Sequence, residues 1–187
     1  MILNQQLNFM TRKPRLFIIE GPDCTGKTSL ARFIANKLNA CYMHSTWTPA
    51  LNGQAQSDYL KSTLNNAKVC LAVSVLDVVL DRHWPSEVCY HKTFRFEQPP
   101  IIVQEFFASM IAMDVIFIFC GGTNREPSIQ RQLEKSDNTW TREQLIKLHS
   151  EYIRCFSNLC ADACSCYSYS IEEHGDKLDG FLEMILK

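Results

Sequence analysis

The sequence lacks three features that would place it in a specialised class: a strong net charge, a long apolar run and paired cysteines. Nineteen Lys and Arg against 20 Asp and Glu leave a net charge of -1 at pH 7. This argues against a broad nucleic-acid surface, because such surfaces are strongly basic. No apolar run reaches membrane-spanning length. Residues 1–13 also lack the apolar stretch of a secretory signal, so we expect a cytoplasmic protein with a loosely held N-terminal extension.

The nine cysteines are odd in number and scattered along the chain. The cluster Cys155, Cys160, Cys164 and Cys166 contains no C-x₂-C pair, the spacing that structural zinc sites favour. We therefore favour reduced thiols, which act as small apolar residues, over a zinc site.

What the sequence does contain is an alternation of apolar runs and helical stripes in one domain, residues 14–187. Strands are predicted at 16–20, 41–44, 75–80, 115–120 and 165–169. Helices are predicted at 29–38, 54–73, 97–112, 139–156 and 171–186, with Thr139 as an N-cap. Residues 121–138 form a polar stretch that we interpret as a long functional loop. The alternation predicts a three-layer α/β/α fold with a five-stranded, mostly parallel sheet.

Residues 21–28 read G-P-D-C-T-G-K-T, directly after a predicted strand and before a helix. This is the G-x-x-x-x-G-K-[ST] loop of P-loop NTPases, and in this context it predicts binding of ATP with Mg²⁺. Gly21 and Gly26 let backbone N–H groups face phosphate oxygens, Lys27 carries charge to the β- and γ-phosphates, and Thr28 is a Mg²⁺ ligand. The other residues expected around the ATP phosphates are Asp23, Cys24, Thr25 and Ser29.

A second group follows the strand at 75–80. Because ligands gather at the carboxyl ends of parallel strands, Asp81 and Arg82 should emerge beside the phosphate loop. Asp81 could then help to hold Mg²⁺, and Arg82 could bind a second phosphate through its forked guanidinium. The alternative is a surface ion pair at a strand end.

These motifs resemble the thymidylate kinase family of nucleoside monophosphate kinases, particularly its short bacteriophage forms. Residues 20–23, E-G-P-D, are similar to the family's E-G-x-D. Residues 81–90 are similar to D-R-Y-x-x-S-x-x-A-Y, with Ser86 and Tyr90 in place. The polar stretch at 121–138, followed by a helix, resembles the family's lid region.

The resemblance implies roles for several side chains. Asp23 would bind the 3′-hydroxyl of the acceptor sugar, Arg82 its phosphate, and Tyr90 would press on the 2′ position and favour deoxyribose. Asp81 would help to place Mg²⁺. The family's members are usually dimers, so a homodimer is implied as well.

The sequence also departs from the family. Cys24 stands where some members have an arginine, so the lid would supply that charge, with Arg125 and Arg131 as candidates. The loop with Trp47 replaces an arginine-containing segment, and Trp47 becomes a candidate stacking residue for the acceptor. His83 replaces a tyrosine.

By the same resemblance, Glu87 stands at the position of a polar residue that reads the base. A carboxylate accepts from guanine, or from the amine of cytosine or adenine, and repels the carbonyls of thymine. Thymidylate as the only substrate is therefore in doubt. A solvated helix residue is the alternative interpretation of Glu87.

We expect an enzyme that transfers the γ-phosphoryl group of ATP to a deoxynucleoside monophosphate, either dTMP-like or broader and including dGMP. A deoxynucleoside kinase is the nearest alternative, although such enzymes carry Glu-Arg-Ser where this chain has Asp-Arg-His. A guanine-nucleotide switch is disfavoured, because the sequence has no N-K-x-D motif.

Overall fold

The computed structural model describes residues 12–45, 53–74, 76–95, 103–110, 113–122, 124–135, 140–161 and 165–187. Its sheet has the strand order β2-β3-β1-β4-β5. All pairings between these strands are parallel, where the sequence predicted a mostly parallel sheet. The strands are β1 (Arg15–Glu20), β2 (Cys41–His44), β3 (Val78–Asp81), β4 (Asp114–Cys120) and β5 (Ser165–Tyr169).

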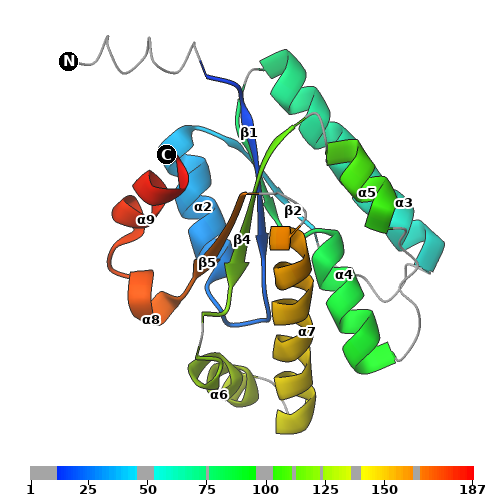
Figure 1. Ribbon diagram of the computed structural model, residues 1–187, viewed down its shortest axis with the longest axis vertical. Coiled ribbons are helices and arrows are strands. Elements are labelled where there is room, and N and C mark those ends of the chain that lie inside the picture. Colours follow the sequence, from blue (N-terminus) through cyan, green and yellow to red (C-terminus); the bar gives the residue numbers. More distant parts are fainter. Residues whose placement is uncertain are drawn as a thin grey trace.

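Helices cover both faces of the sheet, which confirms the predicted three-layer α/β/α arrangement (Figure 1). One face carries α2 (Lys27–Leu38) and α9 (Leu178–Ile185). The other carries α3 (Gly53–Val69), α4 (Trp84–Tyr90), α5 (Val103–Met110) and α7 (Arg142–Ala161). The short α8 (Ile171–His174) follows β5, and α6 (Glu126–Lys135) lies beyond the carboxyl end of β4 (Figure 1). No helix within the described ranges is both long and apolar enough to cross a membrane.

The central strand β1 is apolar without interruption because both of its faces are buried. Leu16 and Ile18 pack into the core formed with α3, α4, α5 and α7. Phe17 and Ile19 pack into the core on the side of α2 and α9. The strict alternation of side chains along a strand therefore divides one short run between two cores.

The turn from β1 into α2 requires glycine at two positions. Gly26 is the N-cap of α2 and has a left-handed φ of 84°. Gly21 has a φ of 143°, and a Cβ built on it would lie 1.9 Å from the carbonyl oxygen of Cys120. The end of β4 thus packs directly against the start of the loop, and a side chain at position 21 has no space.

The third strand begins later than predicted. The pattern at 75–80 indicated a strand, but β3 starts at Val78, and residues Cys70–Ser74 form a π-helical turn that continues α3. Asp77 explains the late start, because its carboxylate accepts from the backbone N–H of Arg15 at 2.8 Å and pairs with Arg12. This buried side chain, rather than a strand ladder, ties residue 77 to the start of β1. Residue 75 lies outside the described residues.

The expectation of a polar loop at 121–138 was wrong for most of that segment, since α6 occupies Glu126–Lys135. The helix is mostly polar, yet one of its faces is buried, and this face consists of Ser128, Ile129 and Gln132. Both Ser128 Oγ and Gln132 Nε2 approach His149 Nε2 of α7, at 3.0 and 3.3 Å. Hydrogen bonding to a neighbouring helix, which no hydrophobic pattern reveals, accounts for the error.

The single C-terminal helix predicted at 171–186 is two helices, α8 and α9. His174 ends α8, where its ring stacks on Tyr169 and meets Phe181 edge-on, with centroid distances of 5.7 and 5.1 Å. Gly175 follows and the chain changes direction. The aromatic contacts therefore break a helix that periodicity alone would continue.

Two other predicted helices differ at their ends. The helix expected at 97–112 is described only as α5, Val103–Met110, and the rest of that range lies outside the described residues. The helix expected at 139–156 runs from Arg142 to Ala161. Its proposed N-cap, Thr139, lies outside the described residues, as do residues 1–11 of the predicted N-terminal extension.

Gly21→Ala should lower the free energy of unfolding by at least about 2 kcal/mol, because an alanine there is both strained and in collision with β4. The matched control is Gly180→Ala in α9, where a Cβ meets nothing within 4 Å. That change should instead stabilise by roughly 0.5–1 kcal/mol through helix propensity. Urea unfolding of both variants checks the difference, and equal effects would contradict the packing described for Gly21.

Candidate active site

Lys27 of the phosphate loop is buried beneath the loop itself. Its ammonium donates to the backbone carbonyl of Pro22, and it lies 4.0 Å from Asp23 Oδ1. Burial, followed by the positive charge of Arg82, lowers the pKa of Lys27 to about 8. The loop therefore holds a cation under strong desolvation, where an arriving anion would stabilise its charged form.

Asp81 at the end of β3 is fully buried and faces α2 and β2. Its Oδ2 accepts from Thr28 Oγ1 at 2.7 Å and from Tyr42 OH at 2.9 Å, and lies 2.9 Å from His44 Nδ1. Its other oxygen, Oδ1, is buried and has no hydrogen-bond partner. A carboxylate with one unpaired oxygen beside a threonine hydroxyl is a donor set that suits Mg²⁺.

Over the described ranges, no group of three or more His, Cys, Asp or Glu side chains is placed to hold a metal ion. A Mg²⁺ ion at Thr28 and Asp81 would therefore take its remaining ligands from phosphate oxygens and water, which is how Mg²⁺ commonly binds beside a nucleotide.

Glu20 is a buried carboxylate behind the site. It accepts from the backbone N–H of His83 at 2.5 Å and from Ser86 Oγ at 2.6 Å. Burial raises the pKa of Glu20 to about 7, although the hydrogen bond from Ser86 and the charge of Arg82 oppose this. Through these two bonds, Glu20 fixes the start of α4 against the end of β1.

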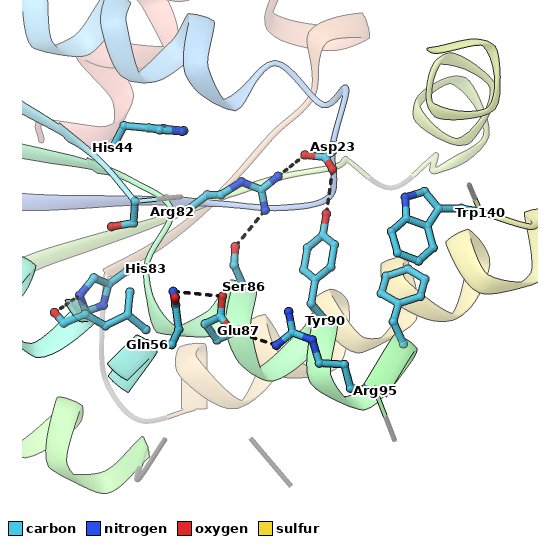
Figure 2. Close-up of a pocket in the computed structure, with 13 residues that line it drawn as sticks. Asp23, His44, Gln56, Arg82, His83, Ser86, Glu87, Tyr90, Arg95 and Trp140 are labelled. Atoms are coloured by element: carbon cyan, nitrogen blue, oxygen red, sulfur yellow. Dashed lines mark hydrogen bonds and ion pairs between the residues drawn. The ribbon is translucent and has the colours of Figure 1, made fainter. Parts of the chain in front are cut away.

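Arg82 is held by three polar side chains in a strained, left-handed backbone conformation with a φ of 72°. One guanidinium nitrogen, Nη1, donates to Ser86 Oγ and Tyr152 OH at 3.2 and 3.3 Å. The other, Nη2, pairs with Asp23 of the phosphate loop. Tyr90 OH donates to the second oxygen of Asp23 at 2.9 Å, so Arg82 and Tyr90 converge on the same carboxylate (Figure 2).

Two cavities meet at Arg82. The first, of about 500 Å³, is lined by polar groups that include Gln56, Ser86, Glu87 and Arg95. The second, of about 490 Å³, is lined by the phosphate loop residues Cys24, Gly26, Lys27, Thr28 and Ser29. The residues that line both are Asp23, His44, Arg82 and Trp140. The predicted donor residues and the predicted acceptor residues thus lie in adjoining spaces.

Glu87 is buried, so its interpretation as a solvated helix residue was wrong. Its Oε1 accepts from Gln56 Nε2 at 3.4 Å, and its Oε2 lies 3.6 Å from Arg95 Nη1 (Figure 2). Burial raises the pKa of Glu87, while the charge of Arg95 opposes that rise. A carboxylate is therefore present inside the first cavity with an arginine close to it.

The two candidate lid arginines lie in different places. Arg131 donates from Nε to the carbonyl oxygen of Cys24 at 3.0 Å and pairs with Glu172 at 2.9 Å. Arg125 is exposed and donates to Ser150 Oγ of α7 at 3.3 Å. Only Arg131 contacts the phosphate loop, and the predicted substrate residue Trp47 lies outside the described residues.

Sequence reasoning missed Gln56, Arg95, His44 and Trp140, all of which line the first cavity. For Arg95 a signal existed: Glu87, His91 and Arg95 are spaced by four, which places them on one face of a helix. Gln56 and Trp140 come from distant segments, and nothing local to them indicates that Gln56 meets Glu87 of α4 or that Trp140 meets Phe94 in the turn after α4.

Comparison with known proteins establishes the fold. No family model matches the sequence, and no curated protein matches it either. Among solved structures, the Bacillus subtilis YorR protein in complex with phosphorylated GDP is similar with a TM-score of 0.68 and 16% identity, over 91% of this chain and 93% of that chain. Deoxyadenosine kinase from M. mycoides with bound dCTP is similar with a TM-score of 0.58 and 14% identity, over 91% and 98%. The structure of the same enzyme with bound dATP has a TM-score of 0.57 and 13% identity, over 92% of this chain and 100% of that chain. The P-loop NTPase fold predicted from the sequence is thus confirmed.

Glu20→Gln should remove a pH dependence of stability. The pKa of Glu20 is about 7 in the folded protein against an ordinary value of 4.5. Between these values the unfolded chain releases a proton that the folded protein keeps, so the contribution of Glu20 to stability falls as pH rises from about 4.5 to 7 and is constant above it.

The measured quantity is the free energy of unfolding of the wild type minus that of Glu20→Gln. As pH rises from about 4.5 to 7, this difference should fall by up to roughly 3 kcal/mol, since one pKa unit corresponds to about 1.4 kcal/mol. Urea unfolding at several pH values measures the difference. A difference that does not change with pH would show that Glu20 ionises at its ordinary pKa in the folded protein.

Proposed function

We propose that the protein is an ATP-dependent kinase of deoxynucleoside monophosphates. The observation that carries this proposal is the position of Arg82, whose side chain lines both the cavity at the phosphate loop and the adjoining cavity at α4. Phosphoryl transfer between two nucleotides needs the donor and acceptor phosphates brought together with cations around them. Lys27 and Arg82 are cations placed on the two sides of that meeting point.

On the donor side, the N–H groups of the phosphate loop and the N-terminus of α2 bind the ATP phosphates. Lys27 would leave the carbonyl of Pro22 for the β- and γ-phosphate oxygens, which offer a full negative charge in its place. Thr28 and Asp81 would hold Mg²⁺, which neutralises charge on the transferring phosphoryl group when bound. Arg131, bonded to Cys24, is the lid residue best placed to add a further positive charge.

On the acceptor side, Arg82 and Ser86 would bind the monophosphate. The phosphate would compete with Asp23 for the guanidinium, which frees a carboxylate oxygen of Asp23 for the 3′-hydroxyl of the sugar. Tyr90 donates to Asp23, so it would lie beside that hydroxyl and face the 2′ position of the sugar. No general base is needed, because the acceptor phosphate is already an anion at neutral pH.

A deoxynucleoside kinase is the second candidate. Such an enzyme must remove a proton from a hydroxyl acceptor, and His44 could do so: its ring lines both cavities and is 2.9 Å from the carboxylate of Asp81. Three of the similar structures are of deoxyadenosine kinase. Several expectations from the sequence stay predictions. They are the likeness to thymidylate kinases and to bacteriophage enzymes, the cytoplasmic location, the homodimer, and the domain boundary between residues 13 and 14.

The deciding experiment supplies ATP and Mg²⁺ with either deoxynucleosides or deoxynucleoside monophosphates and measures the products by chromatography. We expect diphosphates from the monophosphates and no conversion of nucleosides. Conversion of nucleosides alone would exclude the monophosphate kinase and support the second candidate. Turnover of neither class would exclude both.

Lys27→Met should lower kcat by on the order of 10²–10³-fold, because the variant loses a charge that stabilises the transition state. Lys37→Met in the same helix is the control. Lys37 is half-exposed and pairs with Asp179 at 2.8 Å, and such surface pairs contribute little. Near-normal kcat in Lys27→Met would show that Lys27 does not act on the transferring phosphate.

A further inference from the structure

The side chains that line the cavity at α4 include two buried oxygen atoms that accept no hydrogen bond, one of which lies 3.6 Å from the guanidinium of Arg95. They are Oε1 of Gln56 and Oε2 of Glu87. The two side chains are only 3% and 5% exposed, and both line the cavity. Buried acceptors without partners cost free energy, so native proteins keep few of them away from binding sites. Their position indicates a ligand that brings donors.

The orientation of the Gln56 amide follows from its neighbour. Its Nε2 lies 3.4 Å from Glu87 Oε1 (Figure 2). An ionised carboxylate only accepts, so the amide nitrogen must face it and the amide oxygen must face elsewhere. Turning the amide over would place two acceptors against each other. The amide oxygen of Gln56 is therefore directed away from Glu87 Oε1, and both side chains line the cavity.

Arg95 adds a cation to the same surface. Its Nη1 is 3.6 Å from Glu87 Oε2 and 2.5 Å from His91 Nε2. The three residues lie on one face of α4 and the π-helical turn His91–Arg95 that continues it. A ligand that meets this surface should offer donors to Glu87 and Gln56 and an acceptor to Arg95.

An aromatic wall completes the cavity. Phe94 and Trp140 lie against each other with a centroid distance of 3.9 Å, and Tyr90 lies 5.5 Å from Phe94. Flat rings gain from packing against such a wall, whatever their hydrogen-bonding pattern. The wall therefore favours a nucleobase, and the polar floor decides which one.

We propose that Gln56, Glu87 and Arg95 select a guanine base, so that the acceptor of the proposed kinase is dGMP. This inference rests on the proposed function. Guanine alone among the four DNA bases presents two adjacent donors, N1–H and the exocyclic amine, next to a carbonyl acceptor. The two donors would meet the carboxylate of Glu87 and the amide oxygen of Gln56, and the carbonyl would meet Arg95.

The other bases fit less well. Thymine has one N–H between two carbonyls, and a carboxylate repels those carbonyls. Adenine and cytosine each offer one amine beside a ring nitrogen that only accepts, so one of the two oxygens would face another acceptor. Sites that leave a buried polar group unpaired discriminate strongly against the ligand that does so.

The first test uses the unmodified protein. With ATP and Mg²⁺, kcat/KM for dGMP should exceed that for dTMP, dCMP and dAMP. Deoxyinosine monophosphate, which lacks only the exocyclic amine of dGMP, should have a kcat/KM lower by about 10–100-fold, the effect of one lost hydrogen bond to a charged group. Calorimetric binding of the same monophosphates without ATP should show the same order.

The second test changes Glu87, the carboxylate proposed to bind the base. Glu87→Gln should lower kcat/KM for dGMP by about 100-fold, mainly through KM, and reduce the preference for dGMP over dTMP, since an amide can also donate to a thymine carbonyl. Glu183→Gln in α9, an exposed carboxylate of the same type, should leave both values unchanged. If Glu87→Gln does not fold, the comparison of dGMP with deoxyinosine monophosphate in the unmodified protein decides the question.

The two proposals can fail separately. Turnover of monophosphates without a preference for dGMP, or equal use of dGMP and deoxyinosine monophosphate, would overturn the guanine assignment and leave the kinase in place. Selective binding of dGMP without its phosphorylation would keep the base assignment and overturn the kinase.

Discussion

The parallel pairing of β1 with β3 is the constraint on which the whole site depends. Ile19 is in register with Asp81, and the backbone N–H of Arg82 donates to the carbonyl of Ile19 at 3.0 Å. The two strands therefore end side by side, one leading into the phosphate loop and the other into Asp81 and Arg82. Without this pairing, Thr28 could not reach Asp81, and Asp23 could not reach Arg82. Residues about sixty positions apart become one site because parallel strands share a carboxyl edge.

Around this edge the protein buries several ionisable side chains, although burial makes the charged form of such a group costly. Glu20, Lys27, Asp81 and Glu87 are all buried, and the pKa values of Glu20 and Lys27 move in the direction that burial dictates. Buried charges rarely stabilise a fold, because desolvation offsets their attraction. Their concentration at the ends of two neighbouring strands is typical of a functional site and agrees with the proposed binding of two nucleotides.

The similar structures share the fold at 13–16% identity, which shows how little of the sequence the architecture requires. A P-loop fold does not by itself specify a substrate. The groups that we propose to select the base lie instead on α4 and the turn that follows it, where Glu87 is close to Arg95 and to Gln56 of α3. These positions can change without disturbing β1, β3 or the phosphate loop, since they form the wall of a cavity and not the core.

The sequence by itself determined the sheet and the phosphate loop, because the apolar pattern of strands and a glycine-dependent turn are local properties. It also predicted that Asp81 and Arg82 lie beside that loop, since both follow a strand of the same parallel sheet. It misjudged α6 and the start of β3, where His149 and Asp77 make contacts with distant segments, and the break between α8 and α9, where His174 packs against Tyr169 and Phe181. The tertiary structure alone decided that Glu87 is buried and that Gln56 of α3 lies beside it, whereas the spacing by four already indicated that Arg95 shares a helix face with Glu87. Such convergence depends on how helices pack over a sheet, and no periodicity along one segment encodes the partner that another segment will bring.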